Sequence, residues 1–224
     1  MLDVIREVRA RIQRHPDPEM KMGLEATYLL GARASEIVGY ASKSDTTTPY
    51  GPTGEDVWED VYLSGVNATP EPVAIFRLKT AKRYGMERYI ALPLNPAYEP
   101  WARPLFEYFR KKRGRHVFTF TRQTLYNHAR EVLKGLTYTI EPYYCMDTKE
   151  RIGRHEKGAA VHFLRHMRAT ELAFHYGLDK EERAAYCGWT LKSAGITGSQ
   201  LRYMHVYWQG YFPKLLKPCA YAVQ

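Results

Sequence analysis

The segment His162-Phe163-Leu164-Arg165-His166-Met167-Arg168-Ala169-Thr170-Glu171-Leu172 has the residue pattern of a helix with one chemically active face. His162 and Arg165 are three residues apart, so a helix places an imidazole and a guanidinium side by side. The helical pattern continues beyond this segment to about Tyr211. These features predict a chain whose C-terminal half is built mainly from helices.

Two further helical patterns stand at the N-terminus. Apolar residues repeat at helical spacing over 4–12 and end before the prolines at positions 16 and 18. A second pattern begins at Glu19, breaks at Gly31 and resumes at 35–38. Arg33 is therefore expected in a bend between two helices, where a side chain can be aimed at a fixed point.

The middle of the chain predicts one small antiparallel sheet. A loop is expected over 41–54, and the expected strands cover 57–63, 73–78 and 87–92. Helices are expected over 97–112 and 121–136, followed by a Tyr- and Pro-rich connection that covers 137–147 or reaches as far as Gly158. The predicted fold class is mainly α with a small antiparallel β-sheet, in the α+β class.

Size and composition predict one domain. The chain has 224 residues, of which 45% are apolar and 13% aromatic, enough for one sizeable core. No repeat or linker divides it, so we expect a single domain over 1–224, with an N-terminal helix and linker over 1–17 and a C-terminal tail over 208–224. No apolar run reaches the roughly 18 residues that cross a bilayer. The charged N-terminus does not resemble a secretory signal, and we expect an intracellular protein.

The cysteines and acidic residues give no sign of a metal or disulfide site. Cys145, Cys187 and Cys219 are odd in number, far apart and without a CxxC pair. No pair of acidic residues with metal-ligand spacing lies near Arg33 or near the helix of His162. The sequence therefore predicts no metal and no cofactor.

Positive charge favours a polyanionic partner. The formal net charge is +9, and the isoelectric point is near 9.4. About half of the lysines and arginines lie in three basic clusters. Their members are Arg77, Lys79, Lys82, Arg83 and Arg88, then Arg110, Lys111, Lys112, Arg113 and Arg115, then Lys149, Arg151, Arg154, Lys157, Arg165 and Arg168.

Five segments resemble the catalytic domain of the tyrosine recombinase, or phage-type integrase, family. Together they cover about residues 20 to 207. They are Leu29-Leu30-Gly31-Ala32-Arg33-Ala34-Ser35-Glu36-Ile37, Leu78-Lys79-Thr80 before Tyr89 to Leu94, His162 to His166 with Ala169-Thr170, Cys187-Gly188-Trp189, and Arg202-Tyr203-Met204-His205-Val206. The resemblance implies the catalytic-domain fold of that family without the core-binding domain that usually precedes it.

The resemblance also implies a reaction and the residues that perform it. DNA would be cleaved and rejoined at specific sites through a 3′-phosphotyrosyl intermediate, without metal or ATP. The implied catalytic residues are Arg33, Lys79, His162, Arg165, Trp189 and Tyr203. Two fixed guanidinium groups can stabilise the negative charge that develops on the phosphate oxygens. The imidazole can accept the proton of the tyrosine hydroxyl. An ammonium group can donate a proton to the leaving 5′ oxygen.

Supporting or DNA-binding roles are expected for Glu36, Lys82, Arg83, Arg168 and Arg202. Glu36 is expected to brace the bend at Arg33, because a carboxylate beside a phosphate would repel it. Lys82 is the alternative to Lys79. Tyr207 and Tyr211 are the alternatives to Tyr203, because the stretch 191–199 is longer than usual in the family.

The expected partner is double-stranded DNA, with self-association on it from dimer to tetramer and a monomer when free. The resemblance implies that the C-terminal tail over 208–224 packs on a neighbouring subunit, and a tail folded within its own chain is the alternative. The expected location is the cytoplasm, on DNA, in the host cell where a virus or plasmid encodes the chain. A mobile-element integrase, archaeal or viral, fits this description. A type IB topoisomerase-like relaxing enzyme and an inactive basic DNA-binding module are the alternative functions.

Overall fold

The structure is a computed structural model that describes residues 2–39, 51–65, 68–79, 87–140, 142–145, 149–189 and 207–218. Its helices are α1 (Leu2–Gln13), α2 (Pro18–Leu29), α3 (Ala34–Val38), α4 (Ala102–Arg110), α5 (Arg122–Val132), α6 (Val161–Phe174), α7 (Lys180–Cys187) and α8 (Trp208–Leu215). Its strands are β1 (Val57–Tyr62), β2 (Glu71–Lys79), β3 (Glu87–Pro93), β4 (Thr137–Ile140), β5 (Tyr143–Cys145), β6 (Glu150–Ile152) and β7 (His155–Gly158). The α+β class with a small antiparallel sheet is confirmed.

Capping residues, prolines and a glycine set the ends of the two N-terminal helices. The apolar stripe of α1 is buried in the core. Asp17 caps α2, because its carboxylate accepts hydrogen bonds from the backbone N–H groups of Glu19 and Met20 at 2.9 and 3.0 Å. Pro18 occupies the first turn, where its missing N–H costs nothing. Gly31 follows α2 with φ +52°, a conformation that favours glycine, so the predicted break before Arg33 is present.

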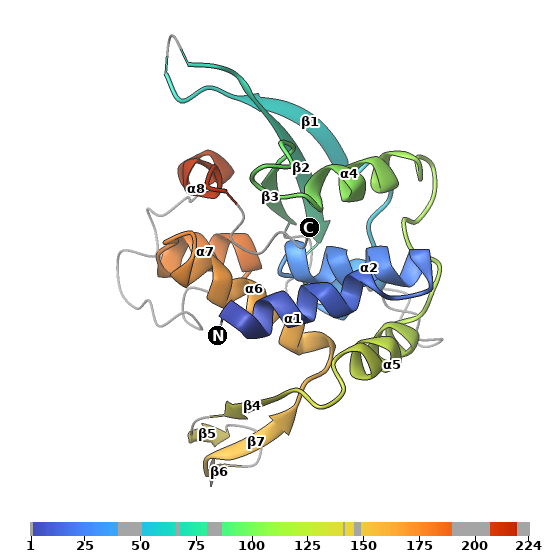
Figure 1. Cartoon of the computed structure of the whole chain (residues 1–224), viewed down its shortest axis with the longest axis vertical. Helices are drawn as coiled ribbons and strands as arrows, with labels where there is room; N and C mark the ends of the chain where they lie inside the picture. The colour runs from blue at the N-terminus through green and yellow to red at the C-terminus, as the bar shows by residue number, and fades with distance from the viewer. Residues whose placement is uncertain are drawn as a thin grey trace.

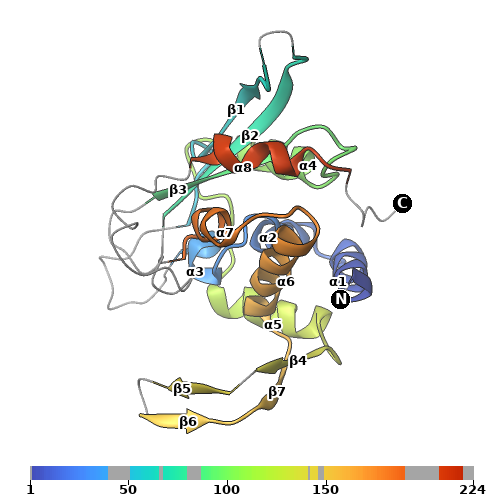
Figure 2. The same cartoon turned by 90° about the vertical axis from the view of Figure 1, so that its left-hand side faces the viewer.

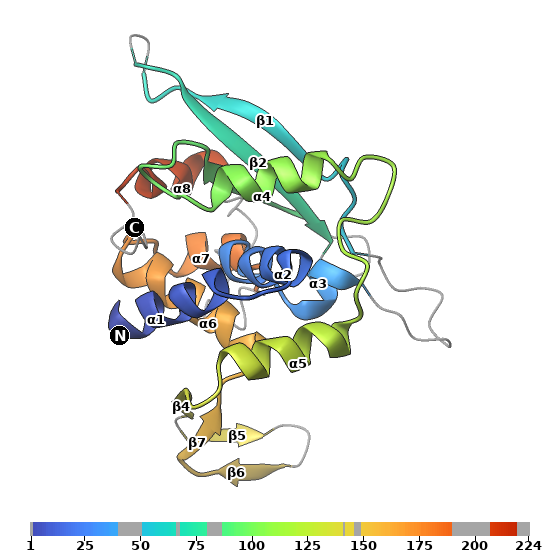
Figure 3. The same cartoon turned by 45° about the vertical axis from the view of Figure 1, so that its right-hand side comes forward.

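The sheet has the strand order β1-β2-β3, all antiparallel. Helix α4 covers one face, where the rings of Phe76 and Phe109 lie 5.1 Å apart between centroids. Helix α8 covers the free edge of β3. There the Tyr211 hydroxyl accepts from the Ala91 N–H and donates to the Tyr89 carbonyl, both at 3.2 Å. Figure 3 shows the sheet with α4 in front of it and α8 beside it. Two backbone groups on the edge of β3 are thereby paired within the chain.

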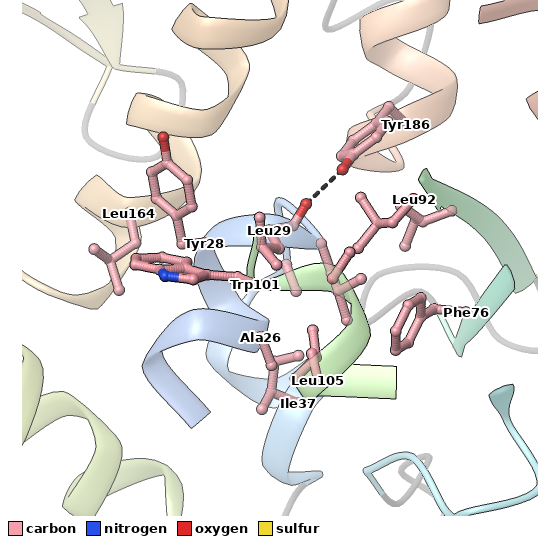
Figure 4. Packing of buried hydrophobic residues seen from close by; sticks show 14 of the residues in the cluster. Ala26, Tyr28, Leu29, Ile37, Phe76, Leu92, Trp101, Leu105, Leu164 and Tyr186 are labelled. Atoms are coloured by element: carbon pink, nitrogen blue, oxygen red, sulfur yellow. Dashed lines mark hydrogen bonds between the residues drawn. The ribbon is translucent and has the colours of Figure 1, made fainter. Parts of the chain in front are cut away.

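Helix α2 lies at the centre of the helical part and contacts α1, α3, α4, α5 and α6. Tyr28 and Leu29 of α2 are completely buried, and the Tyr28 ring meets that of Trp101 edge to face at 5.9 Å (Figure 4). The Tyr186 hydroxyl of α7 donates to the Leu29 carbonyl. One core cluster includes residues from α1 through α8. The bend between α2 and α3 therefore packs against a continuous hydrophobic core.

Helices α4 and α5 are shorter than the sequence predicts. The segment 97–101 forms turns, and α4 starts only at Ala102. Pro100 explains this difference, because a proline disfavours the helical conformation of the residue before it. Helix α5 ends at Val132, and Gly135 follows with φ +83°. Both segments are helical as predicted, but the predicted helices extend beyond the observed ones.

A two-stranded arm replaces the connection predicted over 137–158, and we call residues 137–158 the arm. Strand β4 pairs with β7, and β5 pairs with β6, both antiparallel. The arm projects away from the helices between α5 and α6 (Figures 1 and 2). The sequence pattern indicated only a connection without strands, because tyrosines, prolines and charged residues obscure the strand alternation.

The C-terminal helix packs within its own chain. Tyr211, Phe212 and Leu215 of α8 are buried, and α8 contacts β3 and α7. Residues 208–215 therefore do not pack on a neighbouring subunit as predicted, because their apolar side chains are already buried within their own chain. Among the described residues, no helix is both long and apolar enough to cross a membrane.

Candidate functional site

Glu36 is the centre of the candidate site. It lies in the first turn of α3 and is 3% exposed. Its Oε2 atom accepts the backbone N–H of Arg33 at 3.0 Å, and its Oε1 atom accepts Arg33 Nη1 at 2.8 Å. Glu36 thus braces the bend that carries Arg33, as its place in the sequence indicated.

Arg165 reaches the same carboxylate from α6. Its Nη1 atom donates to the carbonyl of Gly31 at 2.7 Å and lies 3.5 Å from Glu36 Oε2. Arg165 is 1% exposed, and its Nη2 atom has no hydrogen-bond partner among the described residues. The two arginines that the sequence singled out, 132 positions apart, therefore meet at one point, and one of them keeps an unused donor.

Arg88 is a third guanidinium at this point, and the sequence motifs did not mark it as a site residue. Its Nη2 atom donates to Glu36 Oε2 at 2.9 Å, and its Nη1 atom donates to the carbonyls of Leu30, at 3.0 Å, and Tyr186. One signal was available: Arg88 alternates in phase with buried Ile90 on β3, so it occupies the inward side of the strand. We call Arg33, Glu36, Arg88 and Arg165 the Glu36 cluster.

The Glu36 cluster carries an excess of positive charge. Burial alone would raise the pKa of the Glu36 carboxyl, but Arg88, the Arg33 N–H and Arg165 outweigh burial and hold that pKa below its usual value. Burial lowers the pKa of Arg165 to about 10, so its guanidinium stays charged at neutral pH. Three guanidinium groups therefore face one carboxylate, and the cluster has a formal charge of +2.

His162 lies on α6 one turn before Arg165. The residue is solvent-exposed, and its ring meets that of His166 edge to face at 4.6 Å. Partial burial of the ring, followed by the influence of His166 and Arg165, lowers the pKa of His162 to about 4. The imidazole is therefore neutral at pH 7 and able to accept a proton.

Trp189 joins the site from the end of α7. Gly188 ends that helix in the left-handed conformation with φ +65°, and the Trp189 N–H donates to the Ala184 carbonyl at 2.9 Å. The centroid of the Trp189 ring lies 5.8 Å from the Cζ atom of Arg165. The indole is thus within cation–π distance of the arginine with the unused donor.

Lys79, a predicted catalytic residue, does not point toward the Glu36 cluster. It is the last residue of β2, is exposed, and pairs with Glu87, whereas Leu78 pairs with Arg88. Neighbouring residues on a strand point to opposite faces, so Lys79 lies on the face opposite the one from which Arg88 reaches Glu36. Its alternative, Lys82, and Arg83 lie outside the described residues.

Arg168 cannot contact DNA directly. It is 1% exposed, and its guanidinium donates to Glu171 at 2.6 Å and to the Tyr186 hydroxyl at 3.1 Å. Of the supporting and DNA-binding roles expected for this residue, the structure fits the supporting one, because Glu171 and Tyr186 hold its guanidinium in the core. Its role is to support the fold.

The tyrosines near the C-terminus differ in accessibility. Tyr211 is 1% exposed, and burial raises its pKa strongly. A buried, bonded hydroxyl of this kind is a poor nucleophile, so Tyr211 is excluded as an alternative. Tyr207 is 67% exposed at the start of α8. The predicted nucleophile Tyr203 and its neighbour Arg202 lie outside the described residues.

Within the part of the chain that the structure describes, no group of three His, Cys, Asp or Glu side chains could hold a metal ion. Comparison of the chain with protein-family models, with curated proteins and with solved structures finds no match. The function is therefore inferred from the site itself.

Proposed function

We propose that the chain is a tyrosine-type site-specific DNA recombinase, which breaks and rejoins DNA through a 3′-phosphotyrosyl intermediate. The observation that carries the proposal is the Glu36 cluster, in which, among the described residues, three arginines face one carboxylate beside the exposed neutral imidazole of His162. A phosphodiester gains negative charge as it is attacked, and fixed guanidinium groups stabilise that charge without reorganising. This combination suits phosphoryl transfer better than hydrolysis of a neutral substrate.

Each residue has a role in the proposed step. The Tyr203 oxygen attacks phosphorus, its proton passes to His162, and the bond from phosphorus to the 5′ oxygen breaks. Arg33 and the unused Nη2 donor of Arg165 bind the nonbridging oxygens, and Trp189 supplies one further N–H. The reverse reaction with a second strand would complete the exchange, and the covalent link preserves the bond energy, so no ATP or metal is required.

Protonation of the leaving 5′ oxygen is assigned to Lys79, with Lys82 as the alternative. Because Lys79 faces away from Arg88, DNA would have to approach the end of β2 from the other face of the sheet. Arg88 is assigned a positioning role, since it holds Glu36 and the Leu30 carbonyl rather than an open position. Its three hydrogen bonds fix the bend from which Arg33 projects.

The proposed partner is double-stranded DNA, on which copies of the chain would associate. The net charge of +9 supports this choice. Because α8 is already packed in cis, any exchange of the tail between subunits would have to use residues after 215.

The test is covalent capture on a nicked duplex that loses a short strand after cleavage and so traps the adduct. Wild-type protein is expected to form a protein–DNA adduct, and Tyr203→Phe is expected to form none. Tyr207→Phe is the matched control, because it removes an exposed hydroxyl four residues away and should leave the adduct unchanged. Adduct formation by Tyr203→Phe would move the nucleophile elsewhere, and DNA binding by wild type with no adduct at all would favour the inactive binding module.

A further inference from the structure

The arm consists of two strand pairs, β4 with β7 and β5 with β6, that share one register. Ile140 pairs with His155, and Tyr143 pairs with Ile152. The two pairs are three positions apart on each side, so neither side gains or loses a residue between the paired regions. Faces therefore alternate in the same phase within β6 and within β7, and residues 153 and 154 between them belong to neither strand.

This alternation separates charge between the two faces of the arm. Arg151 of β6 and His155 and Lys157 of β7 occupy one face. Glu150 and Ile152 of β6 and Glu156 of β7 occupy the other face, and Arg154 lies between the two strands. The arm holds as many acidic as basic residues, so the basic face arises from their placement rather than from an overall excess of charge.

The basic face is continuous with the face of α6 that carries His162. Tyr138, which pairs directly with Lys157, contacts the rings of Phe163 and His166 at centroid distances of 5.2 and 6.0 Å. Directly paired residues share a face of a ribbon. Lys157 therefore lies on the side that meets α6, and its charge is among the causes that lower the pKa of His166.

The shape of the arm fits a duplex. Residues 155–158 are exposed on both faces, and the arm projects from the helices (Figure 1). A strand rises by about 3.3 Å per residue, so residues 150–158 extend over about 26 Å. The major groove of duplex DNA, about 12 Å wide, admits a two-stranded ribbon. An isolated ribbon is only marginally stable in water, and a partner along one face would stabilise it.

We propose that the face of the arm bearing Arg151, His155 and Lys157 contacts the phosphates of duplex DNA beside the phosphate held by the Glu36 cluster. The inference rests on the proposed function, because it takes DNA as the substrate. It adds a second contact region, which directs the duplex along α6 and the arm. The acidic face then points away from the DNA, where its carboxylates are not repelled by phosphates.

The test compares Arg151→Glu with Arg154→Glu. Both variants change the net charge by the same amount at exposed positions of the arm. They differ in place, because Arg151 lies on the basic face of β6 whereas Arg154 lies between β6 and β7. Binding to a mixed-sequence duplex is measured between about 50 and 200 mM salt. Arg151→Glu is expected to weaken binding by about tenfold relative to Arg154→Glu and to lower the salt slope by about one counterion. Thermal unfolding of both variants checks that the arm change leaves the fold intact.

Each outcome separates this inference from the proposed recombinase activity. Equal losses in the two variants would show that only net charge matters, and unchanged binding in both would show that the arm does not touch DNA; either result overturns the inference. If adducts still form on the nicked duplex, the recombinase proposal survives that result. A difference between the two variants without any wild-type adduct would support the arm contact and overturn the chemistry. No binding by wild type would overturn both.

Discussion

Two buried clusters of arginine and glutamate lie in this molecule, and they differ in charge balance. The Glu36 cluster sets three arginines against one carboxylate, and the Arg33 side chain remains 24% exposed. The second, which we call the Glu171 cluster, sets Arg9 and Arg168 against Glu99 and Glu171. All four of its members are 1% exposed.

The two clusters differ in formal charge. The Glu171 cluster is balanced and enclosed, although Arg168 Nε and Glu171 Oε1 have no hydrogen-bond partner among the described residues. Counted over the described residues, the Glu36 cluster has more arginines than carboxylates. Because burying unpaired charge is costly, this excess is what the proposed phosphate binding would offset.

The largest expected effect lies in the balanced cluster. Arg168→Met would leave Glu171 without its 2.6 Å partner in a buried position, so the free energy of unfolding should fall by about 3–5 kcal/mol. Denaturant titration measures this, with Arg130→Met on the exposed side of α5 as the control. A loss no larger than that of the control would remove the distinction between the two clusters.

The next effect lies in the unbalanced cluster and concerns rate. Arg165→Lys keeps the charge but loses the planar fork that can hold Gly31 and a phosphate oxygen together. Adduct formation should slow by about 10²–10³-fold, which is about 3–4 kcal/mol in barrier height. Duplex affinity should change little, because the positive charge remains. Adduct formation at the wild-type rate would place the reaction outside the Glu36 cluster.

A smaller effect sharpens the comparison through pH. Glu25 is 1% exposed, hydrogen-bonded to Gln13, and influenced by Lys21, Arg9 and Glu99. Burial raises the pKa of Glu25 from 4.5 to about 7, and the nearby charges of Lys21 and Arg9, which act in the opposite direction, do not outweigh it.

The unfolded chain releases the Glu25 proton at lower pH than the folded chain does. Stability is therefore greatest below about pH 4.5 for this group and is lost as pH rises through about 7, by up to about 3 kcal/mol. Glu25→Gln should remove this loss, so that the variant gains stability over wild type at pH 8 and not at pH 4. Chemical unfolding at both pH values measures it. An identical pH dependence in the two proteins would contradict the assignment.

The smallest effect concerns the turn that carries Trp189. Gly188 has φ +65°, so Gly188→Ala should cost about 1 kcal/mol of stability. Gly210→Ala is the control, because Gly210 is helical with open space around it and alanine is the better helix former. The control should be neutral or stabilising in thermal unfolding. A neutral Gly188→Ala would mean that this turn is not held in its strained conformation.

Most of the fold could be predicted from local patterns. The helical periodicity over 4–12, the break at Gly31, and the alternating strands at 73–78 and 87–92 each lie within one element, where spacing alone indicates structure. The arm could not be predicted, since its register depends on pairing between strands rather than on an apolar face. Helix ends were placed less well, because Pro100 and Gly135 act on only a few residues.

The candidate site was predicted in part. The meeting of Arg33 with Arg165, and the brace provided by Glu36, follow from segments that stood out in the sequence. Arg88 was counted only as one charge in a basic run, because its inward position on β3 depends on which face of the sheet is covered. The direction in which Lys79 points could not be predicted for the same reason, because it too depends on which face of the sheet is covered.

The sequence by itself determined most of the helices and strands, the excess of positive charge and the candidate catalytic residues. Tertiary structure alone decided their partners. Arg165 and Arg168 share one side of the same helix by spacing, yet one meets Gly31 and Glu36 and the other meets Glu171 and Tyr186. Their different surroundings come from elements packed on α6 from distant parts of the chain. Burial and ion pairing depend on those neighbours, and no local pattern records them.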